Sequence, residues 1–140
     1  MVHIKMRKIG LLRDKGLEKA VQEILKSKAK TRIYVYLLRK KGAKSEDIIK
    51  GTKLHPSTVR ETLSKMYDDK QIYRKKIKND SIGKNPFIYK AISPITLLKR
   101  RAKELESRLN KLANLTTQSN ENNHVVKIHI FEETLRSHDK

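Results

Sequence analysis

The stretch SEDIIKGTKLHPSTVRETLSKM, residues 45–66, decides the fold class of this chain. Ser45 is predicted to cap a short helix whose first turn carries two carboxylates, and Gly51 is predicted to end it. Pro56 then opens a second helix, at a position where the missing proline N–H costs nothing. Two short helices joined by so brief a turn are typical of a helix-turn-helix, whose second helix is predicted over residues 56–69.

Two further helices are predicted upstream of this motif. Apolar residues recur at one-face spacing over residues 17–25, which indicates an amphipathic helix. Ser27 is a suitable N-cap for the next helix, which is predicted to run to Lys41, and Gly42 supplies its stop. Residues 1–16 precede them as a basic arm.

Downstream, the composition changes from helical to strand-like. In residues 71–78, Ile72 and Ile77 lie in a strand-like segment whose other positions are mostly basic. Residues 79–86 are rich in turn formers, and residues 87–92 have the character of a returning strand. The last three of these helices, followed by a hairpin, have the order of a winged helix. The sequence therefore predicts a mainly α fold with a small β-hairpin, a winged helix-turn-helix over residues 17–93.

A long helix is predicted over residues 94–116, because apolar residues repeat there with alternating steps of three and four. This dimerisation seam consists of Ile95, Leu98, Ala102, Leu105, Leu109 and Leu112. A parallel pair of helices places Arg101 opposite Glu106 of the second copy and is weakly favoured, although an antiparallel pair stays open. The tail, residues 117–140, has strand character only around residues 125–131.

The charge of the chain narrows the choice of partner. Its 34 Lys and Arg residues outnumber 15 Asp and Glu, for a net charge of +19. After Leu115 there are three basic and four acidic residues, so the first 115 residues carry +20. Nucleic acid is the expected partner, because each neutralised phosphate releases a counterion. No apolar run is long enough to insert into a membrane.

The exposed face of the second helix, together with the hairpin, forms the candidate DNA-binding surface. Its predicted members are His55, Ser57, Thr58, Arg60, Glu61, Ser64, Lys65, Arg74, Lys75, Lys76, Lys78 and Lys84. Arg60 is the first candidate for a base contact, since its guanidinium matches two guanine acceptors. Ser57 and Thr58 suit phosphates at a helix N-terminus. The hairpin cations suit the DNA backbone or a minor groove.

Several other chemistries are not expected. The chain has no cysteine, which excludes disulfides and thiolate metal sites. His124, His129 and His138 match no metal-site spacing, and a flexible or partly paired tail explains them better. We expect no cofactor, no bound metal and no enzyme activity, because no nucleophile stands with a matched base. The first ten residues lack the apolar run of a signal peptide, so a cytoplasmic, nucleoid-associated protein is expected.

Residues 17–115 resemble the DNA-binding domain of TrmB-type archaeal regulators. The resemblance lies in Ser45–Val59, in the hairpin and in the segment YKAISP, residues 89–94, which leads into the heptad helix. It implies a winged helix that binds duplex promoter DNA and a long helix that dimerises. Sugar-sensing members carry a large C-terminal domain, whereas only about 25 residues follow here. Lys53 also stands where many such turns have glycine.

Together these features predict a sequence-specific, homodimeric transcription regulator that binds double-stranded DNA. Contact with the basal transcription machinery would fall to the tail. Two alternatives stay open, an architectural chromatin protein that coats DNA without sequence preference and a protein of structured RNA or the ribosome. The operator, the target genes, any effector and the sign of regulation do not follow from the residues.

Overall fold

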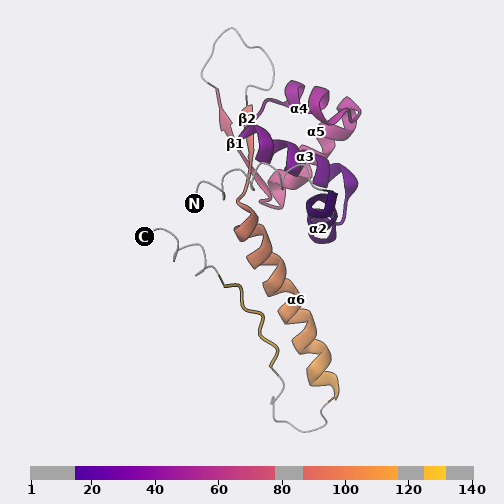
Figure 1. The fold of residues 1–140 in the computed structure, drawn as a ribbon, viewed down its shortest axis with the longest axis vertical. Helices are drawn as coiled ribbons and strands as arrows, with labels where there is room; N and C mark the ends of the chain where they lie inside the picture. Colours follow the sequence, from indigo (N-terminus) through magenta and orange to yellow (C-terminus); the bar gives the residue numbers. More distant parts are fainter. Residues whose placement is uncertain (1–14, 78–86, 117–124, 132–140) are drawn as a thin grey trace. The chain divides into compact units, whose positions relative to one another are not determined.

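The computed structural model describes residues 15–77, 87–116 and 125–131 (Figure 1). Its elements are the helices α2 (Lys15–Leu25), α3 (Lys28–Lys40), α4 (Ser45–Thr52) and α5 (Pro56–Asp68), the strands β1 (Ile72–Lys76) and β2 (Phe87–Ala91), and the helix α6 (Pro94–Thr116). Two compact units meet in sequence at Ser93 and Pro94. The predicted fold class is confirmed: helices, a two-stranded hairpin and a long C-terminal helix follow each other in winged-helix order.

Helix α3 is the centre of the first unit, and it packs against α2, α4, α5 and β2 (Figure 1). It is buried around most of its circumference because apolar and aromatic residues occupy five successive positions, Ile33 to Leu37. Every neighbouring element contributes one face to the same core. The core side chains include Val21, Leu25, Ile33, Tyr34, Leu37, Ile48, Val59, Leu63, Met66, Ile72 and Tyr89.

The caps of α3 and α4 differ in how well local sequence rules locate them. Ser27 caps α3 as predicted, since its Oγ accepts the Lys30 N–H at 3.2 Å. The predicted cap at Ser45 is wrong by one residue. Lys44 is the N-cap of α4 and makes no side-chain cap bond, whereas Ser45 is already helical and buried. The burial of Ser45 against the core explains the shift.

The end of α4 also lies beyond its predicted position at Gly51. The helix continues to Thr52, whose hydroxyl donates to the Ile48 carbonyl at 2.6 Å and so satisfies part of the last turn. Lys53 then takes the left-handed conformation, with φ of 59°. The backbone therefore turns here as a glycine would, at a cost of roughly 1 kcal/mol for a residue with a side chain.

The wing is an antiparallel hairpin in which Ile72 pairs with Ala91, Arg74 with Tyr89 and Lys76 with Phe87. Ala43, in the connection between α3 and α4, exchanges backbone hydrogen bonds of 3.0 and 2.8 Å with Tyr89. This bridge attaches β2 to the start of the helix-turn-helix. The hairpin is consequently oriented by the backbone as well as by side chains.

A buried tyrosine also joins α3 to the chain leaving the hairpin. Tyr34 is fully buried, and its hydroxyl donates to the Ile92 carbonyl at 2.7 Å. Burial raises the pKa of the Tyr34 hydroxyl well above its ordinary value of 10.0. The phenol therefore stays neutral in the folded protein at a pH where it ionises in the unfolded chain.

We expect this raised pKa to give an alkaline limit to stability. Above about pH 10 the unfolded state binds fewer protons than the folded state, so the free energy of unfolding falls with pH, by up to about 1.4 kcal/mol per pH unit. Tyr34→Phe should lower the free energy of unfolding by about 1 kcal/mol at neutral pH. Above about pH 10 its free energy of unfolding should fall less steeply with pH than that of the wild type. Urea unfolding of both proteins between pH 8 and 11 tests it. Equal slopes for the two would contradict the assignment.

The second unit contains α6 and the extended segment 125–131. The Asn110 side-chain amide bonds both the N–H and the C=O of Val126, and Glu106 Oε2 accepts the Ile128 N–H at 3.0 Å. Residues 125–131, which have strand character in the sequence, form no β-ladder with another described segment. Within the described ranges, no helix is both long and apolar enough to cross a membrane.

Candidate nucleic-acid interface

The turn between α4 and α5 is closed by side chains of its own residues. The Leu54 N–H donates to Thr52 Oγ1 at 3.4 Å. His55 is the N-cap of α5, and its Nδ1 accepts the Ser57 N–H at 3.2 Å and lies 2.8 Å from Ser57 Oγ. A neutral His55 that accepts through Nδ1 carries its proton on Nε2. Exposed at the helix start, that N–H is available to an acceptor such as a phosphate oxygen.

Helix α5 has one buried and one exposed face, as predicted for a reader helix. Val59, Leu63 and Met66 are buried against the core. On the other side, Ser57, Arg60, Glu61, Ser64 and Lys65 are exposed, while Thr58 is half-buried. The exposed face therefore consists of small polar and charged side chains, the type that fits into a major groove.

The charges on this face are not equivalent. Lys65 Nζ forms an ion pair with Glu61 Oε1 at 3.1 Å, one helical turn away. Arg60 makes no ion pair or hydrogen bond with any residue that the structure describes. A guanidinium without a local carboxylate keeps both of its donor edges for a partner. Arg60 is therefore the cation on this helix most ready to bind an acceptor outside the chain.

The wing contains an arrangement that sequence reasoning missed. The Arg74 guanidinium lies between two rings, 4.0 Å from the Tyr67 centroid and 4.3 Å from the Phe87 centroid. Tyr67 lies in the last turn of α5, and Phe87 begins β2. Arg74 was predicted as a DNA contact, yet its guanidinium also connects the end of α5 to both strands of the wing. The spacing of Tyr67 and Arg74 does not predict this arrangement, because Phe87 belongs to a strand that lies further along the sequence.

The other described wing cations have no such attachment. Lys75 and Lys76 are exposed and form no ion pair with described residues. Lys78 and Lys84, also predicted to contact DNA, lie outside the described residues. The described part of the predicted surface thus combines one positioned arginine and two unattached lysines on the hairpin.

We expect Arg74→Ala to loosen the wing without unfolding the domain. Two ring contacts are lost, each worth about 0.5–1 kcal/mol at an exposed site, so unfolding should cost about 1–2 kcal/mol less. Arg74→Lys keeps the charge but loses the planar stacking and should recover less than half of that. Thermal unfolding measures the loss, and amide exchange at β1 and β2 locates it. Unchanged exchange in the hairpin would argue against this role of Arg74.

Along α6, the predicted dimerisation seam is unevenly covered. Leu98, Leu105 and Leu112 are 42%, 39% and 62% exposed. Ile95, Ala102 and Leu109 are half-buried. Arg101 and Glu106, the pair that favoured parallel helices, both have partners within the chain: Arg101 bonds Glu104 at 3.4 Å, and Glu106 accepts from Ile128.

Comparison with known families gives a match to the TFIIE alpha subunit over residues 17–120. The chain belongs to the TFIIE alpha family. The match runs from α2 through α6 and so includes the helix-turn-helix, the wing and the long helix. Membership of this family makes the chain a winged-helix domain of transcription-factor type. The TrmB-type assignment is not confirmed.

One similar solved structure is a possible transcriptional regulator from Methanosarcina mazei Go1. The two share 19% sequence identity over 73% of this chain and 89% of the other, with a TM-score of 0.59. At this identity the likeness shows the fold alone. Comparison with curated proteins gives no match.

Proposed function

We propose that this TFIIE alpha family member is a transcription regulator that binds duplex DNA with sequence preference, as a homodimer. The proposal rests above all on α5, which presents a small polar face. At its N-terminal end lies the Arg60 guanidinium, which has no ion-pair or hydrogen-bond partner among the described residues. The net charge of +19 supports a polyanionic partner. The family supports a role in transcription.

In this proposal α5 enters the major groove and the wing, residues 74–86, follows the DNA backbone or an adjacent minor groove. Arg60 donates two hydrogen bonds to guanine O6 and N7. His55 and Ser57 bind phosphate at the helix start, where the dipole favours anions. Lys75 and Lys76 add sequence-independent affinity through the backbone.

Self-association through α6 is the second part of the proposal, and its support is the row of exposed leucines on a seven-residue repeat. We expect Leu105→Glu to weaken dimerisation about tenfold or more, because a carboxylate in an apolar seam loses its hydration. Ser107→Glu adds the same charge at an exposed position outside the seam and should leave self-association unchanged. Sedimentation velocity over a concentration series measures both. Monomeric wild-type protein at all concentrations would remove the dimer from the proposal.

An architectural role without sequence preference is the competing function, and the size of the positive charge favours it. The two functions differ in the ratio of specific to non-specific affinity. A regulator typically shows about 10³–10⁷, whereas a coating protein shows a ratio near one.

Contact with the basal transcription machinery is a further part of the proposal, assigned to residues 118–140. Deletion of these residues should then abolish promoter control while DNA binding persists.

The experiment that tests the function uses sheared DNA of the native genome. Purified protein is incubated with the fragments at roughly 0.2 M salt, where phosphate attraction alone is weakened, and bound fragments are sequenced. Sharp peaks that share an inverted repeat are expected. Even coverage would replace the regulator with an architectural protein, and failure to retain duplex DNA at any salt concentration would overturn both.

A further inference from the structure

Two arginines of helix α3 lie on a different side of the helix from the residues that bond the end of α5 and the chain leaving β2. Tyr34 reaches the chain leaving β2, and Lys30 Nζ pairs with Asp69 Oδ2 at the end of α5 at 3.5 Å. Arg32 and Arg39 are seven residues apart and so share one stripe of the helix, roughly opposite to Tyr34 and Lys30. Their side chains are exposed. These two arginines therefore do not belong to the surface formed by α5 and the hairpin.

Two adjoining hollows are lined in part by α3. The smaller, about 140 Å³, is lined by Arg32 and Arg39 of α3, with Glu18 of α2 and Thr52 of α4. The larger, about 500 Å³, is lined by Lys40, Asp47 and Lys50, and also by Gly42 and Ala43, which connect α3 to α4 beside β2. Tyr36 and Gly51 line both. We call these two hollows together the α3–α4 groove.

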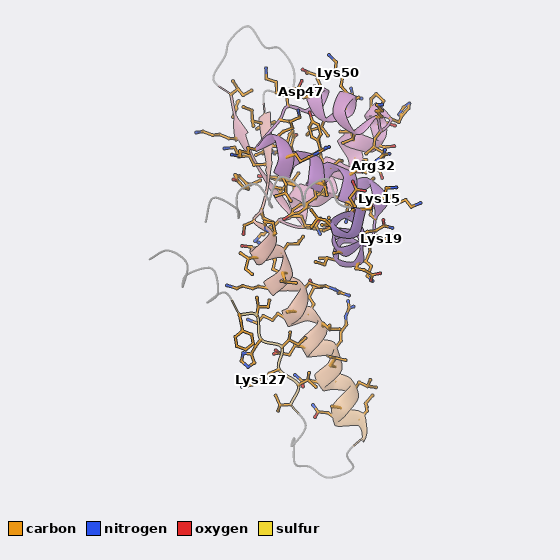
Figure 2. All side chains as sticks on the ribbon, viewed as in Figure 1. Lys15, Lys19, Arg32, Asp47, Lys50 and Lys127 are labelled. Atoms are coloured by element: carbon orange, nitrogen blue, oxygen red, sulfur yellow. The ribbon has the colours of Figure 1, made fainter. Side chains whose placement is uncertain are left out.

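The groove carries an excess of positive charge, four cations against two carboxylates among its lining residues. Its cations are Arg32, Arg39, Lys40 and Lys50, and its carboxylates are Glu18 and Asp47. None of the four cations forms an ion pair or hydrogen bond with another described residue. Figure 2 labels Lys15 and Lys19 on α2, Arg32 on α3 and Lys50 on α4. Cations gathered without partners favour an external anion.

The lining of the groove distinguishes between classes of anionic partner. Protein interfaces have an apolar, often aromatic, central patch, but the apolar side chains here are covered: Val35 is 3% and Tyr36 8% exposed. What the groove offers is guanidinium and ammonium groups, with the two arginines about 10 Å apart along the helix. Arginine forks bind phosphate oxygens in pairs. The chemistry therefore fits a phosphate backbone better than an acidic polypeptide.

We propose that the α3–α4 groove binds the phosphate backbone of a second DNA duplex, so that one domain bridges two duplexes. This inference rests on the proposed function, in which α5 and the wing hold the first duplex. The groove contributes affinity without sequence preference, because it contacts phosphates only. Bridging would bring distant sites together and adds DNA looping to the regulator's activity.

The test uses the full chain, one immobilised duplex and a second, labelled duplex of equal sequence. Wild-type protein should retain the labelled duplex. Arg32→Gln with Arg39→Gln removes two phosphate contacts, and since each contact adds about 0.9 to the salt slope, retention near physiological salt should fall about tenfold or more. Its affinity for a single duplex, measured by gel shift, should stay within about threefold, because each lost surface charge contributes little at a distance.

Lys103→Gln with Lys111→Gln is the matched control, since it removes the same charge from exposed positions of α6. It should bridge like the wild type. The arginine variant keeps α5, the wing and the seam of α6. If two duplexes are instead bridged by a dimer, one on each α5, the variant should still bridge them.

Each other outcome identifies what fails. Unchanged bridging by the arginine variant would overturn the inference. So would an equal loss of single-duplex binding, which would assign the arginines to the first interface. Wild-type protein that binds one duplex but never retains a second would overturn bridging alone, whereas absence of any duplex binding would overturn the proposed function as well.

Discussion

Gly51→Ala is expected to lower the free energy of unfolding by up to about 2 kcal/mol. A Cβ built at this position lies 2.0 Å from Cε1 and 2.6 Å from Cζ of the Tyr36 ring. Tyr36 is buried, so either the ring leaves its position or α4 moves away from α3. Overpacking of this kind costs about 1–3 kcal/mol. The usual gain of about 1 kcal/mol for alanine over glycine in a helix offsets only part of it.

A double-mutant cycle separates this clash from other effects. Tyr36→Ala removes the ring, so Gly51→Ala in that background should be neutral or stabilising by up to about 1 kcal/mol, as helix propensity alone predicts. Urea denaturation with unchanged m values supplies all four free energies. A destabilisation that persists without the ring would show that the close approach of α3 and α4 at Tyr36 is not what requires glycine.

Arg60→Ala is expected to weaken binding to the preferred DNA site about 10- to 100-fold, which corresponds to one bidentate guanine contact. Binding to random duplex should change far less. Arg60→Lys keeps the charge but loses the planar fork, so it should also lose preference while its salt dependence stays that of the wild type. Fluorescence anisotropy with the specific and the random duplex, each over a salt series, measures both quantities.

Lys75→Ala provides the contrasting case, since Lys75 is an exposed cation on the wing with no described ion-pair partner. It should weaken specific and random duplexes alike and reduce the salt slope by about 0.9. If Arg60→Ala behaves in the same way as Lys75→Ala, Arg60 is a backbone ligand, and sequence preference must come from other residues of α5.

Some helix ends could be predicted from the sequence, and others could not. Ser27 and Pro56 mark the starts of α3 and α5 because capping is a property of a few neighbouring residues. Ser45 and Gly51 led to wrong helix ends, because tertiary packing and not the neighbouring residues decides their roles. Serine and glycine usually mark helix ends, but here the first is buried in the core side of α4 and the second lies under the Tyr36 ring.

The sequence was sufficient to locate the candidate site, but not to predict which contacts each of its side chains makes. The exposed positions of α5 follow from its 3.6-residue period once Val59, Leu63 and Met66 are assigned to the core. That Glu61 pairs with Lys65 was also within reach, since they stand four residues apart. The position of Arg74 between Tyr67 and Phe87 was not, because one ring lies on a helix and the other on a returning strand.

By itself, the sequence determined the order of the elements, the net charge of +19 and the leucine repeat of α6. All three depend on residues close together in the chain or on composition alone. Tertiary structure decided which cations are free: Arg60 and Arg32 lack described partners, whereas Arg74 is held between two rings. An ion pair such as Glu61–Lys65 follows from sequence spacing, but the contact of Arg74 with Phe87 joins residues far apart in sequence, and only the tertiary packing of the hairpin sets that distance.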